Sequence, residues 1–312
     1  MSIIEKALEK LGHVKAADPD HRGQDHSGPE DGLSSEPEAT GGPHQHDSAD
    51  SVVQPKRSRT IEIDLHQLKK YGYLTPGTGN IVIAEQYRRI KRPILINAFE
   101  EKGAHLSNRN LVMVTSAVPK EGKSFTSLNL ALSIATELNQ TALFVDADIA
   151  RRTNSKFLGL EEEPGLTDLL MSDKADMSQY LLKTNIPNLS ILPAGSYYEK
   201  THEMWASNKM RNLMTEVSNR YNDRVIIFDA PPILLDSSSQ ILARHVGQVV
   251  FVIEAEKTHM QMIQEALETI VDSQYIGLVL NKSNRRLVSE YGYYGHVNFP
   301  LPKTRPAGKS PA

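Results

Sequence analysis

The sequence predicts a doubly wound α/β fold with a mainly parallel sheet. Six short runs rich in β-branched residues alternate with segments whose apolar residues recur at helical spacing. The runs lack a polar residue at every second position, which indicates strands that are buried on both faces. Helices in the connections would supply that cover. A chain of 312 residues, 39% of them apolar, can bury one sizeable core of this kind.

The first 58 residues are expected to lie outside this domain. Residues 1–12 place apolar side chains on one side of a helix and charged ones on the other, which predicts a short amphipathic helix that ends at Gly12. Docking on a partner and packing on its own domain are both open to so short a helix. Residues 13–58 are rich in Pro, Gly, Ser, Asp and His and contain no aromatic residue, which predicts a disordered linker.

The domain itself is expected to span residues 59–286, with a flexible tail over 287–312. A helical run covers residues 84–100. The expected strands are 111–117, 142–148, 188–194, 224–230, 248–255 and 276–282, and the clearest helices between them are 127–138, 209–221 and 260–271. Because ligands of such folds bind at the carboxyl ends of strands, the functional residues are sought there.

A phosphate-binding motif follows the strand at 111–117. Ala117, Gly122, Lys123 and Ser124 have the P-loop spacing A-x-x-x-x-G-K-S between a buried strand and an amphipathic helix. Such a loop turns backbone N–H groups toward phosphate oxygens, while the lysine binds the β and γ phosphates and the hydroxyl binds Mg²⁺. The sequence therefore predicts a site for ATP and Mg²⁺. Its candidate nucleotide-binding residues are Ala117, Glu121, Gly122, Lys123, Ser124 and Phe125.

Two further strands end in aspartates. Asp229 follows four apolar residues, where a carboxylate can hold Mg²⁺ directly or through water. Asp146 and Asp148 lie where the strand 142–148 gives way to a loop. Two carboxylates at one strand end repel each other unless a cation or proton intervenes, which favours a metal-linked role for one and a proton-accepting role for the other. The candidate catalytic residues are thus Lys123, Asp146, Asp148 and Asp229.

Composition narrows the classes of function. The 35 basic and 38 acidic residues nearly cancel, so no global charge favours nucleic-acid binding, and no nucleic-acid partner is expected. The absence of cysteine excludes disulfides, thiolate metal sites and cysteine nucleophiles, and is consistent with a reducing cytoplasm. The longest apolar runs are shorter than the ~18 residues of a spanning helix. We therefore expect a cytoplasmic protein.

These motifs, together with the tail SEYGYYGH at residues 289–296, resemble those of the bacterial tyrosine kinase family. The likeness is greatest to the separate cytoplasmic autokinases of exopolysaccharide gene clusters, and it covers residues 81–295. In that family the three motifs are named Walker A, Walker A′ and Walker B. The resemblance implies that Lys123 binds phosphates, that Ser124, Asp148 and Asp229 serve Mg²⁺, and that Asp146 and Asp148 assist the metal and the incoming tyrosine.

The resemblance also implies further sites and partners. The strand end VLNK resembles one that contacts adenine in related ATPases, with Asn281 as the candidate residue. The helix residues Glu85, Arg88 and Lys91 resemble the E-x-x-R-x-x-R oligomerisation motif, although the spacing alone favours an ordinary charged helix face. The phosphoacceptors would be Tyr291, Tyr293 and Tyr294. The implied partners are copies of this chain in a ring, a membrane polysaccharide chain-length regulator that recruits the kinase to the inner face of the plasma membrane, and a tyrosine phosphatase.

The sequence departs from the family pattern at several positions, and two other functions remain open. Lys120 stands where most members have glycine in the P-loop, and Ala150 stands where many have arginine. A partition or septum-positioning ATPase shares the fold, but it carries a second lysine where this chain has Val118. A non-catalytic, nucleotide-dependent regulator of polysaccharide assembly is the third interpretation. We expect a protein-tyrosine autokinase that regulates exopolysaccharide synthesis, polymerisation and export.

Overall fold

The computed structural model describes residues 59–283, with the exception of 78–80, 173–175, 199–200, 271–272 and 274. The predicted N-terminal helix, the predicted linker and the three tail tyrosines lie outside the described residues. Within this part of the chain, no helix combines the length and apolar character that a membrane span requires.

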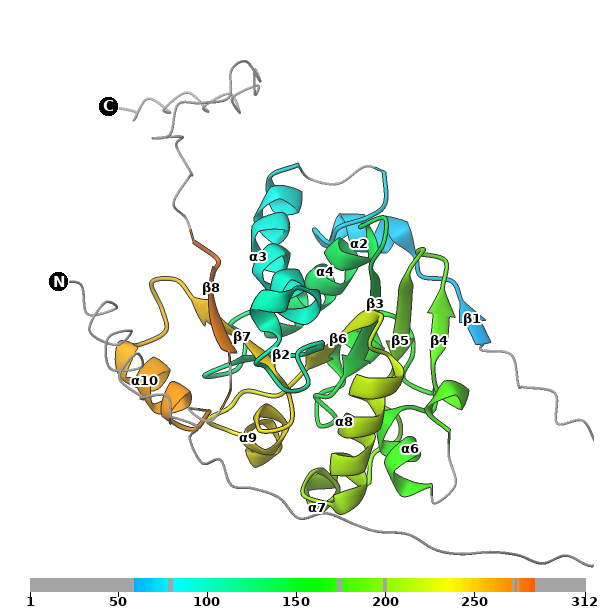
Figure 1. Cartoon of the computed structure of the whole chain (residues 1–312). Helices are drawn as coiled ribbons and strands as arrows, with labels where there is room; N and C mark the ends of the chain where they lie inside the picture. Colours follow the sequence, from blue (N-terminus) through cyan, green and yellow to red (C-terminus); the bar gives the residue numbers. More distant parts are fainter. Residues whose placement is uncertain are drawn as a thin grey trace, which may run out of the picture. The chain divides into compact units, whose positions relative to one another are not determined.

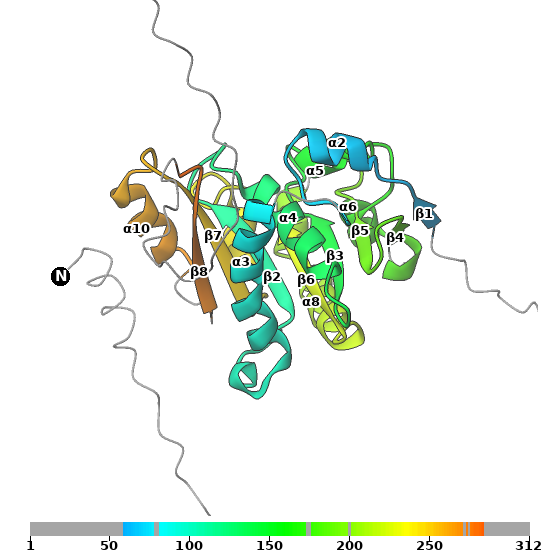
Figure 2. The ribbon, with the colours of Figure 1, turned by 90° about the horizontal axis from the view of Figure 1, so that it is seen from above.

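An eight-stranded sheet forms the centre of the domain, and its strands follow the order β1-β4-β5-β3-β6-β2-β7-β8 (Figure 2). Every neighbouring pair is parallel except β4 with β5. The strands are β1 (Arg59–Ile61), β2 (Leu111–Ser116), β3 (Thr141–Asp146), β4 (Leu182–Thr184), β5 (Leu189–Leu192), β6 (Arg224–Asp229), β7 (Gln248–Glu254) and β8 (Tyr275–Asn281). The predicted fold class is therefore confirmed.

Helices cover both faces of the sheet (Figure 1). They are α2 (Leu65–Lys70), α3 (Ile81–Phe99), α4 (Lys123–Ala135), α5 (Thr153–Phe157), α6 (Leu166–Met171), α7 (Thr201–Trp205), α8 (Asn208–Arg220), α9 (Ser237–Ala243) and α10 (Met260–Glu268), with 3₁₀ turns η1 (Glu101–Gly103) and η2 (Met177–Gln179). Successive residues of a strand point to opposite faces. In β2, Val112 and Val114 pack in the cluster with α3 and α4, while Leu111 and Met113 pack in the cluster with α6, α8 and α9.

The six predicted strands are all present, with ends that differ by at most two residues. The short strands β1 and β4 were not expected, because runs of only three residues carry no periodic signal. Helix α4 begins at Lys123 rather than at residue 127. The reason is Gly122, which has φ 101° and turns the loop directly into the first helical residue.

Candidate active site

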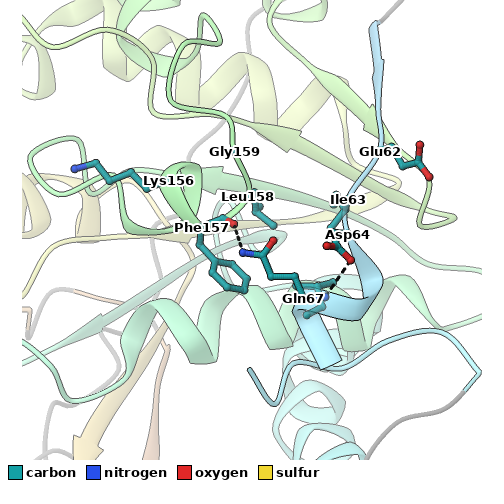
Figure 3. Close-up of a pocket in the computed structure, with 9 residues that line it drawn as sticks. Glu62, Ile63, Asp64, Gln67, Lys156, Phe157, Leu158 and Gly159 are labelled. Atoms are coloured by element: carbon teal, nitrogen blue, oxygen red, sulfur yellow. Dashed lines mark hydrogen bonds between the residues drawn. The ribbon is translucent and has the colours of Figure 1, made fainter. Parts of the chain in front are cut away.

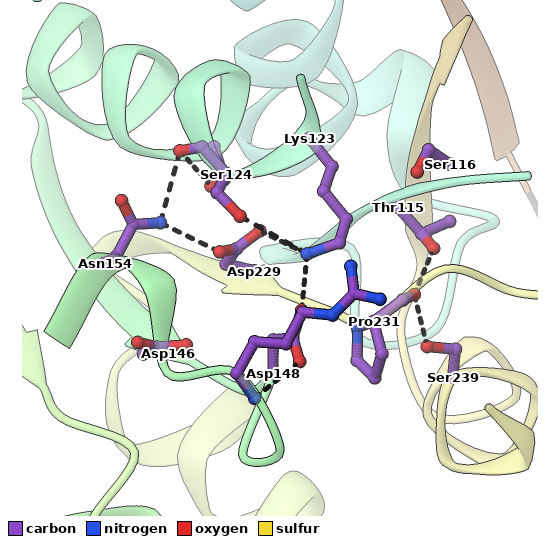
Figure 4. A network of polar contacts seen from close by, with 12 residues as sticks. Thr115, Ser116, Lys123, Ser124, Asp146, Asp148, Asn154, Asp229, Pro231 and Ser239 are labelled. Atoms are coloured by element: carbon purple, nitrogen blue, oxygen red, sulfur yellow. Dashed lines mark hydrogen bonds and ion pairs between the residues drawn. The ribbon is translucent and has the colours of Figure 1, made fainter. Parts of the chain in front are cut away.

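The sheet order places three strand ends side by side. Strand β6 pairs with β3 on one side and with β2 on the other, and Asp229 lies in register with both Asp146 and Val114. The P-loop leaves β2 three residues after Val114. The P-loop therefore meets Asp146 and Asp229, which are 83 residues apart along the chain, at one edge of the sheet (Figure 4).

Helix α4 and the end of β8 shape the P-loop. A Cβ atom on Gly122 would lie 2.0 Å from Nδ2 of Asn281, so only glycine fits there. Asn281 donates from Nδ2 to the carbonyl oxygen of Glu121 at 2.8 Å. The Glu121 side chain is buried, and its carboxylate accepts hydrogen bonds from the backbone N–H of Val118 at 2.7 Å and from the hydroxyl of Thr258. Glu121 and Asn281 thus hold the loop, and the adenine contact of Asn281 stays a prediction.

Lys123 contacts the aspartates. Its Nζ lies 2.6 Å from Oδ2 of Asp148, 4.0 Å from Oδ1 of Asp229 and 3.3 Å from Oγ of Ser124. Burial by itself would lower the pKa of Lys123, but the charges of Asp229 and Asp148 outweigh it and keep the pKa above its ordinary value. The ammonium therefore stays charged in a buried position, and the carboxylates hold it where a phosphate oxygen can replace Asp148.

Asp146 and Asp229 are fully buried, and burial raises the pKa of both. The pKa of Asp146 rises to about 7, because burial and then the charge of Asp229 outweigh the hydrogen bonds that it accepts from Ser155. Those bonds come from the backbone N–H at 2.8 Å and from Oγ at 2.7 Å, and both end on Oδ2. The pKa of Asp229 is raised by burial, against the opposing effect of Lys123.

Asn154 joins the site although the sequence analysis did not identify it. Its Nδ2 donates to Oδ2 of Asp229 at 2.8 Å and to the carbonyl oxygen of Ser124 at 3.2 Å. It lies in the five-residue helix α5, and its side chain is fully buried. A polar residue just after the aspartate pair was the only signal in the sequence, and a surface asparagine gives the same signal.

Three buried oxygens at this site have no hydrogen-bond partner among the described residues: Oδ1 of Asp146, Oδ1 of Asp229 and Oδ1 of Asn154. Unpartnered buried polar atoms are uncommon, and carboxylate and amide oxygens are the ligands that Mg²⁺ prefers. The donor set therefore fits the predicted cation. Within the described part of the chain, no group of three or more His, Cys, Asp and Glu side chains could hold a metal on its own. A cation here would complete its coordination with phosphate and water oxygens.

A cavity of about 390 Å³ opens in front of the P-loop. Its walls are Lys120, Gly122, Lys123, Ser124, Phe125, Arg151 and Thr153. Phe125 also lines a second cavity, of about 620 Å³, between α3 and β8, to which Asn281 contributes. The first cavity is suited to phosphates because cations line it. The neighbouring one, with apolar walls from Ile83, Ile90 and Val279, has the character of a site for a flat base.

A third cavity, of about 250 Å³, lies between α2 and the end of α5 (Figure 3). Its polar groups bond to one another. Oδ1 of Asp64 accepts the backbone N–H groups of His66 and Gln67, and Nε2 of Gln67 donates to the carbonyl oxygen of Phe157 at 3.3 Å. The Asp64 bonds cap α2, and the bond from Gln67 to Phe157 fastens this helix to the domain.

The three residues of the expected oligomerisation motif differ in exposure. Glu85 and Arg88 form an exposed ion pair on α3. Lys91 is buried, and its Nζ donates to the carbonyl oxygen of Ser133 at 2.6 Å and lies 2.6 Å from Oε1 of Glu137. Lys91 therefore contacts its own subunit, because it faces α4 and not the surface, while the assembly role of Glu85 and Arg88 stays a prediction.

Comparisons with known proteins agree with this geometry. Residues 120–283 match the model of the AAA domain family. The chain is 34% identical over 214 residues to the tyrosine-protein kinase YwqD of Bacillus subtilis, a match that covers 68% of this chain and 86% of the relative. It is 31% identical to the putative tyrosine-protein kinase CapB of Staphylococcus aureus, with 68% and 90% covered. The crystal structure of the VpsO kinase domain is similar, with TM-score 0.55, 29% identity and 65% and 98% covered.

Proposed function

Since the chain belongs to the bacterial tyrosine-protein kinase family, we propose that it transfers the γ-phosphate of Mg·ATP to tyrosines of its own tail. The acceptors in this proposal are Tyr291, Tyr293 and Tyr294. One observation carries it: the P-loop ammonium of Lys123 lies among buried carboxylates, beside oxygens that lack a partner. That arrangement supplies a phosphate-binding cation, a metal-binding set and a proton acceptor in one place.

Lys123 would bind the transferring phosphate. It exchanges its contact with Asp148 for one with phosphate oxygens, and its buried position makes the new interaction stronger than it would be in water. Ser124 and Asp229 would hold Mg²⁺, and Asp146 and Asn154 offer their unpartnered oxygens to the ion or to its waters. When bound, the ion neutralises charge on the phosphate oxygens.

Asp148 would act as the base. Once Lys123 has turned to the phosphate, the carboxylate of Asp148 is free to accept the proton of a tyrosine hydroxyl. The tyrosine oxygen then forms a bond to the γ-phosphorus while the bond to the β–γ bridging oxygen breaks, and ADP leaves. Asp148 would also keep its predicted place in the metal shell, since within the described part of the chain its Oδ1 accepts one hydrogen bond, from the backbone N–H of Arg151 at 3.3 Å.

The partners follow from the same proposal. A ring of copies would bring each tail to a neighbouring active site, and the exposed pair of Glu85 and Arg88 is available for contacts between copies. We also propose two partners. One is a membrane polysaccharide chain-length regulator that recruits the kinase to the inner face of the plasma membrane, and the other is a tyrosine phosphatase that removes phosphate from the tail. The output would be control of exopolysaccharide synthesis and export.

The fate of labelled phosphate tests the function. Purified protein incubated with γ-labelled Mg·ATP should acquire covalent label on tyrosine, and Lys123→Met should lose about 10²–10³-fold of the rate, as for removal of a charge-stabilising donor. Lys183→Met, an exposed lysine on β4, is the matched control and should label normally. Label only in free phosphate would favour a partition-type ATPase. No turnover at all would favour a non-catalytic regulator.

A further inference from the structure

We propose that Lys120 is a second phosphate-binding cation, which contacts the terminal phosphoryl group from the mouth of the P-loop. The inference deepens the proposed function and depends on it, since it needs ATP in the cavity. Lys120 has a positive φ in the P-loop, a conformation that side chains rarely adopt, so a lysine there requires an explanation.

The backbone of Lys120 gives the first part of the argument. Its φ is 70°, in the left-handed region that glycine adopts freely and lysine does not. Gly122, two residues on, also has a positive φ. Alternation of this kind turns successive N–H groups inward and builds an anion-binding nest. A glycine would give the same nest without strain, and strain kept at a site of this kind points to a use for the side chain.

Contacts from the end of β8 hold this strained backbone. Nζ of Lys282 donates to the carbonyl oxygen of Lys120 at 2.5 Å, next to the bond from Asn281 to Glu121. The ammonium of Lys282 is itself fixed by the carboxylate of Glu254 at 3.1 Å. Two consecutive carbonyl groups of the P-loop therefore bond to the end of β8, and Lys120 is one of the residues that line the phosphate cavity.

The charges around the cavity give the second part. Three cations line it, namely Lys120, Lys123 and Arg151, and no carboxylate is among its lining residues. Asp148 holds the ammonium of Lys123, whereas neither Lys120 nor Arg151 has a carboxylate partner in the part of the chain that the structure describes. Two uncompensated cations that face one cavity repel each other and attract an anion. A polyphosphate is the anion that the P-loop beside them would bind.

The position of Arg151 indicates which phosphate of the nucleotide Lys120 would contact. Its backbone N–H bonds to Asp148, the proposed base, at 3.3 Å, so the charge of Arg151 comes to the cavity from the loop that carries that base. In this proposal the γ-phosphate would lie between that loop and the P-loop. Lys120 would thus stabilise the charge that develops on the transferring group and its oxygens.

Three substitutions in the full-length protein separate charge from backbone conformation. Lys120→Met removes the charge and keeps a side chain in the strained position, Lys120→Gly removes both charge and strain, and Lys120→Arg keeps the charge. Lys183→Met is the control. The dissociation constants of Mg·ATP and Mg·ADP are measured by calorimetry, and single-turnover transfer is followed with γ-labelled ATP.

Both uncharged variants should bind Mg·ATP about tenfold more weakly, the loss expected for one charge-assisted contact, and should transfer phosphate more slowly. Their affinity for Mg·ADP should change less than about threefold, and Lys120→Arg should retain most of the ATP affinity. Normal ATP affinity in Lys120→Gly would overturn the inference, because conformation alone would then explain the position. Equal losses for ATP and ADP would also overturn it. Wild-type protein that binds no Mg·ATP would instead overturn the proposed function itself.

Discussion

Asp146 couples the active site to the stability of the protein. Its folded-state pKa is about 7, against an ordinary value of 3.8, so between these pH values the folded protein holds a proton that the unfolded chain has lost. The proton favours the folded state. The contribution of Asp146 to stability is therefore full below about pH 4 and declines as the pH rises to about 7.

We predict that Asp146→Asn stabilises the ligand-free protein, and increasingly so as the pH rises. The asparagine oxygen can still accept both hydrogen bonds from Ser155, and its neutral amide removes the buried charge beside Asp229. Thermal unfolding in the presence of a chelator should give a Tm difference, variant minus wild type, that grows from about pH 4 to pH 7 and then levels off.

An aspartate with the opposite shift is the control for this series. Hydrogen bonds from Ser178 and Arg220 lower the pKa of Asp176, so its contribution is present at neutral pH and is lost as the pH falls. Asp176→Asn should therefore be less stable than wild type near neutral pH, and the difference should vanish in acid. A Tm difference for Asp146→Asn that does not vary with pH would contradict the raised pKa.

At the scale of elements, α3 has a buried face that contacts the domain and an exposed face that carries an ion pair. Lys91 fastens α3 to α4, the helix that begins at the P-loop, through Ser133 and Glu137. Glu85 and Arg88 lie on the exposed side. The motif thus divides into an internal contact and a surface pair, and the two can be changed separately.

Lys91→Met should lower the free energy of unfolding by about 1–2 kcal/mol, because a buried carbonyl oxygen and a half-exposed carboxylate lose their charged partner. Its sedimentation profile at temperatures below the transition should match that of the wild type.

The double variant Glu85→Ala and Arg88→Ala should instead change the sedimentation profile and leave the stability nearly unchanged. An exposed ion pair contributes about 0–1 kcal/mol, so Tm should barely change while the protein shifts toward monomer. Dissociation by Lys91→Met alone, at unchanged Tm, would contradict this division.

At the scale of the whole molecule, the order of the strands brings the residues of the site together. The chain returns to β6 between β3 and β2, which brings residues 123, 148 and 229 together. Of the tyrosines in the described domain, Tyr87 is buried and burial raises its pKa above the ordinary value, whereas Tyr71 and Tyr197 are exposed. A kinase with this arrangement needs a tyrosine that can reach the cavity, and in our proposal the tail supplies it.

We predict that the transfer occurs between copies of the chain. A Lys123→Met protein with an intact tail is mixed with an active protein whose Tyr291, Tyr293 and Tyr294 are replaced by phenylalanine. Label should appear on the tail of the inactive chain, because only the neighbouring active site can modify it. The inactive protein alone is the control. Label confined to the active chain, or mapped by mass spectrometry to Tyr71 or Tyr197, would contradict the prediction.

The local pattern of the sequence determined the α/β class, the six long strands, the P-loop and the three aspartates. Each of these is encoded by neighbours: a strand by a continuous apolar run, and the phosphate loop by glycine, lysine and serine at fixed spacing. The sequence pattern also predicted that the aspartates lie near the P-loop, because the carboxyl ends of parallel strands share one edge of a sheet.

Only the tertiary structure decided what each polar side chain contacts. Asn281 bonds to Glu121 across 160 residues, Asn154 bonds to Asp229 across 75, and Lys91 bonds to Ser133 across 42. Such contacts depend on which strand is inserted between which others, and on which face of a helix is buried. Residue spacing does not contain that information, because a charged or amide side chain has the same local signature on the surface as in the core. For this reason the sequence located the site, while the fold determined which residues hold it together.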